Sequence, residues 1–121
     1  GLAFKPGTDD LREAPSIDNI SLLLKNGADI VAYDPVAMNN FKKKFPEGVV
    51  ERGTISYTNQ IEEALKDANI CFIFTEWKEI KKVEPEAIKQ LMRTPLVYDG
   101  RNIFDPEKMK AAGVEYYSIG R

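Results

Sequence analysis

The chain has 121 residues, of which 43% are hydrophobic and 30% charged, so it can form one compact domain over residues 1–121 and is not intrinsically disordered. With a net charge of -2 the chain lacks the overall basic field that nonspecific nucleic-acid binding requires, so we expect no nucleic-acid partner. No apolar run approaches the roughly 20 residues of a membrane span and no secretory leader is visible, so we expect a cytoplasmic protein with no membrane partner. The absence of histidine and the single Cys71 exclude an imidazole base, the usual zinc sites and an internal disulfide.

The first five residues, Gly1 to Lys5, are mostly apolar and predict the inside of a strand. Because this strand has neither a start methionine nor a lead-in, we expect the sequence to begin partway through a longer natural chain. The Pro6-Gly7 pair and the aspartates after it predict a loop.

A helix is predicted to begin near Pro15, because proline suits the first helical turn, and to end before Gly27. Residues 29–33 are short and apolar and close with Asp34-Pro35, as expected of a buried parallel strand. The alternation then continues with helices over residues 36–45, 61–68, 85–92 and 106–112, and strands over residues 54–57, 70–74, 96–98 and 115–118. The strand at 70–74 is the most apolar, so we expect it at the centre of the sheet.

Strands that alternate with helices predict a Rossmann-like three-layer α/β sandwich, with one open, mainly parallel sheet and helices on both faces. Ligands of such sheets lie beyond the carboxyl ends of the strands. The loops of interest therefore cover residues 5–14, 34, 75–77 and 99–102.

The glycine-rich turn that holds a dinucleotide is missing from the first loop. Gly1 lies in the predicted strand and Gly7 stands alone, so Asp34 loses the ribose-binding role that would accompany such a turn. We interpret Asp34 as part of an Asp-Pro turn. The domain is not expected to bind NAD by itself in the Rossmann manner.

Two cations are predicted to follow strands at the same edge of the sheet. Lys5 can hold a phosphate or sugar oxygen there, or it can be a solvated lysine at a strand end. Arg101, in the segment from Asp99 to Asn102, can present a planar set of donors to a phosphate or a uracil carbonyl.

Arg12 lies just before a helix, where the partial positive charge of the helix end disfavours a cation. Either an anionic ligand or a salt bridge to Asp9, Asp10 or Glu13 can explain this position. The Asp9-Asp10 pair is interpreted as helix and loop capping, with acid/base work or Mg²⁺ binding as the alternatives. Cys71 lies within an apolar strand and is interpreted as a core residue, and residues 42–44 as a solvated helix face.

The sequence closely resembles the C-terminal domain of the UDP-glucose/GDP-mannose dehydrogenase family over essentially its whole length. The resemblance rests on four motifs in the same order as in the family. These are the opening run Gly1-Leu2-Ala3-Phe4-Lys5-Pro6-Gly7-Thr8-Asp9-Asp10-Leu11-Arg12-Glu13, then Tyr33-Asp34-Pro35, Thr75-Glu76-Trp77 and Asp99-Gly100-Arg101-Asn102.

The resemblance implies an NAD-dependent enzyme that oxidises the C6 hydroxyl of a nucleotide sugar to a carboxylate in two hydride transfers. In the family, the intermediates form on a cysteine in a preceding part of the chain, so no catalytic residue is expected here and Cys71 does not take that role. NAD is expected to be bound mainly by an N-terminal domain of the same chain. The isolated domain is expected to be inactive and monomeric, and the full-length protein a homo-oligomer.

The resemblance also implies roles for four residues. Phe4, Lys5 and Arg101 match positions that contact the UDP-sugar, and Arg12 matches one that reaches the cofactor across the cleft between domains. UDP-glucose is the favoured substrate. UDP-N-acetylmannosamine, UDP-N-acetylglucosamine and GDP-mannose are the alternatives within the family.

Two functions of other classes are alternatives for a domain of this length and fold. A phosphoacceptor receiver has a similar length, but it needs an aspartate after its third strand and a lysine after its fifth, where this sequence has Arg101. A regulatory nucleotide-binding domain without a catalytic parent is supported by the fold alone.

Overall fold

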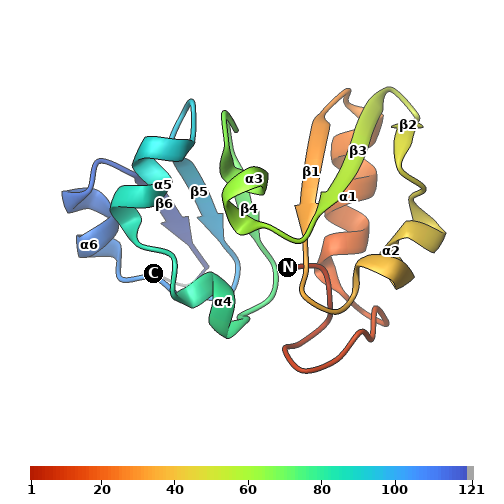
Figure 1. The fold of residues 1–121 in the computed structure, drawn as a ribbon, viewed down its shortest axis with the longest axis horizontal. Helices are drawn as coiled ribbons and strands as arrows, with labels where there is room; N and C mark the ends of the chain where they lie inside the picture. The colour runs from red at the N-terminus through yellow and green to blue at the C-terminus, as the bar shows by residue number, and fades with distance from the viewer. Residues whose placement is uncertain (120–121) are drawn as a thin grey trace.

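The computed structural model describes residues 1–119, which form helices and strands in alternation (Figure 1). The helices are α1 (Pro15–Lys25), α2 (Met38–Lys44), α3 (Ile61–Leu65), α4 (Lys78–Lys81), α5 (Pro85–Leu91) and α6 (Pro106–Ala111). The strands are β1 (Asp29–Tyr33), β2 (Gly48–Val50), β3 (Gly53–Thr58), β4 (Cys71–Ile73), β5 (Leu96–Asp99) and β6 (Glu115–Ser118).

The strands form two three-stranded sheets, in the orders β1-β3-β2 and β4-β5-β6. All neighbours are parallel except β2, which runs antiparallel to β3. The mainly parallel Rossmann-like α/β class is therefore confirmed. The prediction of a single sheet with residues 70–74 at its centre is wrong for the described residues, because β4 pairs with β5 alone and lies at a sheet edge.

The predicted opening strand is also absent: residues 1 and 2 have irregular structure and residues 3–5 form a bend. The backbone amides of Leu2 and Ala3 donate to a carboxylate oxygen of Asp34 rather than to a neighbouring strand. The amide of Phe4 donates to the carbonyl of Asp10 at 2.9 Å and closes the loop that follows. The apolar pattern of this segment reflects burial of Leu2 and Ala3 in the core and not strand pairing.

Helix α1 has the predicted limits: Pro15 occupies its first turn, and Gly27 follows its end with a positive φ of 86°. Its buried residues Ile20 and Leu24 face the first sheet. At Gly53, the first residue of β3, a β-carbon would lie 2.3 Å from the Ala28 carbonyl oxygen, so the close packing of this region requires glycine.

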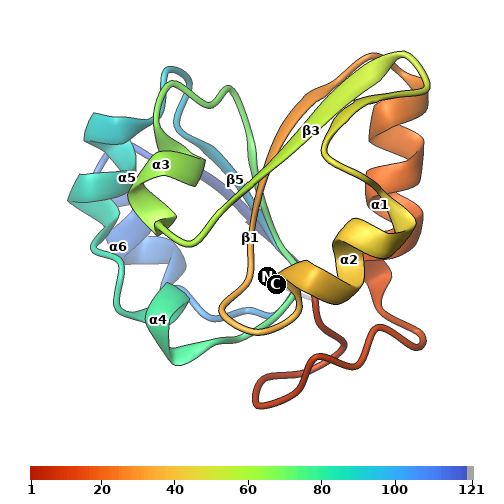
Figure 2. The same ribbon diagram turned by 45° about the vertical axis from the view of Figure 1, so that its right-hand side comes forward.

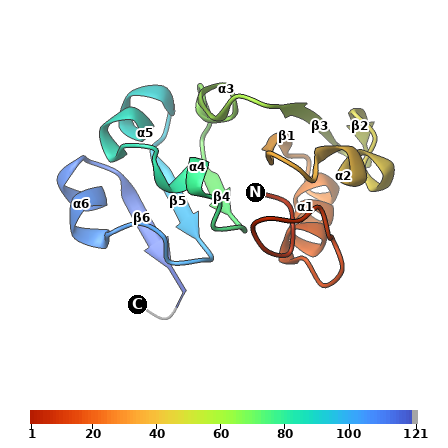
Figure 3. The same cartoon turned by 60° about the horizontal axis from the view of Figure 1, so that its bottom comes forward.

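The helices cover opposite sides of the sheets. In Figure 3, α1 lies on one side of β1 and β3 and α3 on the other, whereas α5 lies beside the second sheet. Figure 2 shows α1 and α2 beside the first sheet, with α4, α5 and α6 grouped around the second. The predicted three-layer arrangement is thus present, because each of the two sheets is covered by helices of its own.

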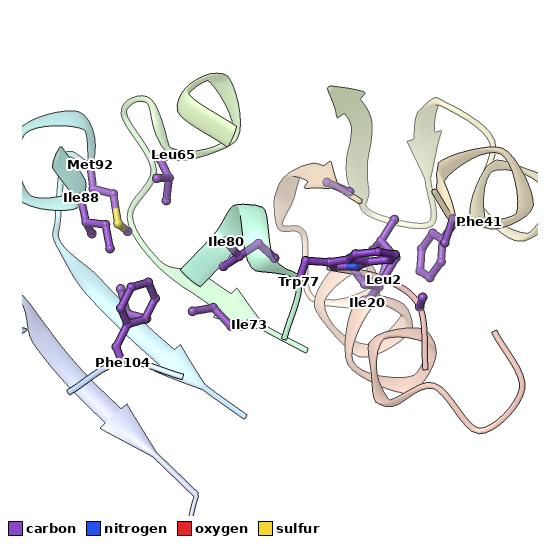
Figure 4. Packing of buried hydrophobic residues seen from close by; sticks show 14 of the residues in the cluster. Leu2, Ile20, Phe41, Leu65, Ile73, Trp77, Ile80, Ile88, Met92 and Phe104 are labelled. Atoms are coloured by element: carbon purple, nitrogen blue, oxygen red, sulfur yellow. The ribbon is translucent and has the colours of Figure 1, made fainter. Parts of the chain in front are cut away.

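One continuous apolar core joins the two halves. Figure 4 shows Leu2, Ile20 and Phe41 on the side of the first sheet, and Ile73 and Phe104 on the side of the second. The indole ring of Trp77, from the loop after β4, projects toward Leu2. The residues that open the chain and the loop after β4 therefore link the halves.

Two short elements were not predicted. Strand β2 lies between Pro46 and β3, and α4 follows Trp77 directly. Within residues 1–119, none of the helices combines the length and apolar character needed to cross a membrane.

Candidate functional site

Asp34 follows β1 directly and is fully buried. Its Oδ2 accepts hydrogen bonds from the amides of Leu2 and Ala3 and from Nε1 of Trp77, at 2.7, 3.0 and 3.0 Å. Its Oδ1 accepts from the amides of residues 36 and 37. Burial alone would raise the pKa of Asp34, but the backbone donors outweigh it and hold the pKa below the ordinary 3.8. The predicted Asp-Pro turn is confirmed, and the same carboxylate also fixes the opening of the chain.

Two buried hydroxyls hold the carbonyl groups of the same opening segment. The Ser16 hydroxyl on α1 donates to the Leu2 carbonyl, and the Thr75 hydroxyl after β4 donates to the Ala3 carbonyl, both at 2.6 Å. Residues 1–3 are thus held from the end of β1, from α1 and from the end of β4. The position at which Phe4 and Lys5 leave this segment is therefore fixed by buried polar contacts.

Asp99 plays a similar part at the end of β5, where it is also buried. Its carboxylate accepts hydrogen bonds from the amides of Arg101, Ile103 and Phe104. The amide of Gly100 donates to the Ile73 carbonyl, and a β-carbon at Gly100 would lie 3.0 Å from that oxygen. The close turn predicted at Gly100 is confirmed, and it places Arg101 beside the loop after β4.

Arg101 pairs with Glu76, which the sequence did not indicate. Its Nε and terminal nitrogen donate to the two carboxylate oxygens at 2.8 and 2.9 Å. The Arg101 pair lowers the pKa of Glu76, because hydrogen bonds to the carboxylate favour its charged form. About a third of each side chain is exposed, at 30% and 29%. This pair uses two of the five N–H donors of a guanidinium, which leaves Arg101 able to bind an anion at the same time.

Phe4 and Lys5 are both exposed, with Phe4 at 39%. They follow the segment held by Asp34 and Thr75, and Glu76, the residue after Thr75, holds Arg101. The backbone segments that carry Phe4, Lys5 and Arg101 are therefore linked through Asp34, Thr75 and Glu76.

Arg12 lies on the surface loop before α1, which the hydrogen bond from the Phe4 amide to the Asp10 carbonyl closes. The Arg12 side chain is 90% exposed, and its guanidinium pairs with the Asp10 carboxylate at 2.8 Å. The predicted salt bridge is therefore confirmed, with Asp10 as the partner of Arg12. The bonds from Arg12 lower the pKa of Asp10 to about 2. A shallow hollow beside the loop is lined by Arg12 together with Asn40, Lys43 and Lys44 from α2.

Other sequence interpretations are also tested by the structure. Asp10 accepts from the Arg12 amide, as loop capping requires, and residues 1–119 contain no group of three or more possible metal ligands. Cys71 packs against the core, and burial raises its pKa to about 11, which suppresses the reactive thiolate. Residues 42–44 form the exposed face of α2, as predicted.

The sequence alone does not predict the hydrogen bonds of Ser16, Glu76 and Trp77. The sequence identifies the run Thr75-Glu76-Trp77 as one motif. Hydrophobic periodicity does not indicate that each of its side chains bonds a different segment. A signal was available at Trp77, because a buried indole N–H requires an acceptor. Asp34 was the buried acceptor within reach.

The family described as "UDP-glucose/GDP-mannose dehydrogenase family, UDP binding domain" matches residues 1–106. UDP-glucose 6-dehydrogenase YwqF of Bacillus subtilis (strain 168) is 46% identical over 121 residues, covering 100% of this chain and 26% of that protein. UDP-glucose 6-dehydrogenase of Pseudomonas aeruginosa PAO1 is 41% identical, with 100% and 26% covered. The chain thus spans about a quarter of the length of these relatives.

Solved structures give the same result. The NDP-N-acetyl-D-galactosaminuronic acid dehydrogenase of Methanosarcina mazei Go1 superimposes with a TM-score of 0.78 at 25% identity, covering 100% of this chain and 23% of that one. The family match spans the opening segment, the loops after β1 and β4, and the loop after β5, which the structure joins into one network. The chain therefore belongs to the UDP-glucose/GDP-mannose dehydrogenase family, of which it represents the UDP-binding domain.

Proposed function

We propose that this chain is the C-terminal UDP-sugar-binding domain of a longer, NAD-dependent UDP-glucose 6-dehydrogenase that converts UDP-glucose to UDP-glucuronate. The observation that carries the proposal is the network of Asp34, Thr75 and Glu76, which links the segment that leads into Phe4 and Lys5 to the loops after β1 and β4 and to Arg101. These loops follow the carboxyl ends of parallel strands, where α/β sheets bind ligands. The identity of 46% to a UDP-glucose 6-dehydrogenase favours UDP-glucose over the other nucleotide sugars.

In this proposal, Arg101 binds the UDP moiety through the donors that Glu76 does not use, and Lys5 lies near the sugar. Phe4 contributes an exposed aromatic surface beside them. Anchoring the diphosphate far from C6 restrains the reacting carbon, so binding energy from a remote group contributes to catalysis. No residue of this chain is assigned to the chemical step.

In this proposal, the first loop of the chain does not hold the dinucleotide. The loop between residues 4 and 10 closes on itself, and Ala14 precedes α1 where a glycine-rich turn would be needed. NAD, the hydride acceptor of the family, is proposed to be bound mainly by the N-terminal domain, with Arg12 as the contact from this chain. The Arg12 side chain is 90% exposed beside a hollow lined by the cations Lys43 and Lys44 and by the carboxylates Asp9, Asp10 and Glu13, so it is accessible to a partner. The full-length protein is proposed to be a homo-oligomer in the cytoplasm.

The test is the activity of the full-length protein with UDP-glucose and NAD. We expect Lys5→Ala to lower kcat/KM by about 100-fold, because the lost cation orients the reacting sugar. Lys25→Ala is the matched control, since Lys25 is an exposed lysine at the end of α1, and should leave kcat/KM unchanged. Near-normal kcat/KM in Lys5→Ala would remove Lys5 from the site.

A further inference from the structure

The Arg101 guanidinium is bonded to Glu76 along one edge. Its Nε and a terminal nitrogen donate to the two carboxylate oxygens at 2.8 and 2.9 Å, so the contact is bidentate and fixes both the position and the plane of the group. A guanidinium has five N–H donors in one plane, and two of the remaining three lie side by side at the end of the group, one on each terminal nitrogen. An anion can therefore bind that end without displacing Glu76.

The backbone that carries Arg101 is restrained as well. The buried Asp99 carboxylate accepts the Arg101 amide at 2.9 Å and the Ile103 amide at 2.8 Å. The amide of Gly100 donates to the Ile73 carbonyl at 2.9 Å, which ties the loop after β5 to β4. The freedom that remains to Arg101 thus lies in its side-chain torsions, and these are what Glu76 restrains.

Glu76 is itself placed by its two neighbours. Thr75 is fully buried and donates to the Ala3 carbonyl at 2.6 Å, and Trp77 is 7% exposed and donates to Asp34 at 3.0 Å. The residues on both sides of Glu76 are therefore anchored in the core, while its own side chain stays at the surface. The carboxylate that meets Arg101 is fixed by the same contacts as the opening segment of the chain.

The pair orients Arg101 more than it stabilises the fold. Both side chains are about a third exposed, at 30% and 29%, and solvent screening makes exposed ion pairs weak contributors to stability. An unrestrained arginine side chain samples many rotamers, and a ligand that binds it has to restrict them. An arginine that is already held before the ligand arrives loses less conformational entropy on binding.

We propose that Glu76 is a positioning residue for nucleotide binding, which holds the Arg101 guanidinium in the free protein so that its unbonded end meets an oxygen of the UDP moiety. The inference rests on the proposed function, because it requires that Arg101 binds UDP. The charge of Glu76 acts in the opposite direction, since a carboxylate near the site repels an anionic ligand. The sign of the change in UDP affinity on removing that charge therefore separates positioning from simple repulsion.

The experiment is titration calorimetry of UDP into the full-length protein carrying Glu76→Gln, which retains the size of the side chain. We expect the Kd for UDP to rise about 10-fold, because an amide cannot hold the guanidinium through two charge-assisted bonds. Glu79→Gln is the matched control, since Glu79 is an exposed glutamate of α4 and loses the same charge, and it should leave the Kd unchanged. An unchanged or lowered Kd in Glu76→Gln would overturn the proposal.

The same substitution in an Arg101→Ala background separates positioning from a merely structural role. If Glu76 acts through Arg101, Glu76→Gln should not weaken UDP binding further once Arg101 is absent. A further rise of about 10-fold in that background would show that Glu76 supports the site by another route, and would overturn the proposal.

Failure of the proposed function gives a different result. Arg101→Ala alone would then leave the Kd for UDP unchanged, and the inference about Glu76 would fail with it. A raised Kd in Arg101→Ala together with a normal Kd in Glu76→Gln would overturn the inference alone and leave the UDP site in place.

Discussion

At the residue scale, Asp34 is the polar group on which the candidate site depends most. Its carboxylate is held by five N–H donors, three of them on a single oxygen. A buried carboxylate is stable only when it is bonded in this way. Its contacts therefore connect the position of Lys5, the loop after β1 and the loop after β4.

We expect Asp34→Asn to lower the free energy of unfolding by about 2–4 kcal/mol, because the amide group of asparagine would face N–H donors on one side of the site. Urea denaturation measures the change. Asp105→Asn is the matched control, since Asp105 is an exposed helix-capping residue at which asparagine is equally suitable. Equal effects of the two substitutions would show that Asp34 is not a structural centre.

At the scale of the elements, the junction of α1 with β3 depends on glycine. The Leu24 side chain and the Ala28 carbonyl both lie within 3.1 Å of the place where a Gly53 β-carbon would be. We expect Gly53→Ala to lower the free energy of unfolding by about 1–3 kcal/mol, because the backbone there cannot move away without separating α1 from the sheet.

Ser56→Ala in the same strand is the control for this substitution. Ser56 is exposed, so the free energy of unfolding should change by less than about 0.5 kcal/mol. A stable Gly53→Ala variant would mean that α1 packs on β3 less closely than the structure indicates.

The sequence predicts these elements well where the pattern is local. Strands 29–33 and 115–118 have the predicted limits, and the Pro15 start and Gly27 end of α1 are confirmed, because these features depend on neighbouring residues. The opening strand and the central position of residues 70–74 are wrong, because pairing depends on a neighbour that an apolar pattern does not identify. Strand β2 is not predicted, because its three residues are too few to show an apolar pattern typical of a strand.

The candidate site could be predicted only in part, because some of its contacts join residues that are far apart in the sequence. The loops that carry it follow from the topology, because the carboxyl ends of parallel strands share one edge. The pairing of Arg101 with Glu76 joins residues 25 positions apart and left no local signal. The Arg12 pair with Asp10 spans two residues and was among the predicted partners.

At the scale of the whole molecule, the lowered pKa values of Asp34 and Glu76 predict how stability depends on pH. Both groups lose protons more readily in the folded state, so their contribution is fully present above their ordinary pKa values of 3.8 and 4.5. It is lost as the pH falls through the lower folded values. We expect the urea midpoint to be nearly constant between about pH 7 and 5 and to fall below about pH 4.

Glu76→Gln removes one of these titrating groups. The decline of the urea midpoint in acid should be shallower in this variant than in the unmodified protein, because fewer protons are taken up on unfolding. A midpoint that stays constant down to about pH 3 would contradict the assigned role of the two carboxylates.

The central claim is that the edge formed by the opening segment and the ends of β4 and β5 binds UDP. Titration calorimetry of UDP into the full-length protein tests it most directly, with Arg101→Ala compared with Arg93→Ala, an exposed arginine of the α5–β5 loop. We predict that Arg101→Ala raises the Kd for UDP by about 10- to 100-fold, because a charged hydrogen-bond donor is lost, and that Arg93→Ala does not. An unchanged Kd in Arg101→Ala would contradict the assignment of this edge as the UDP site.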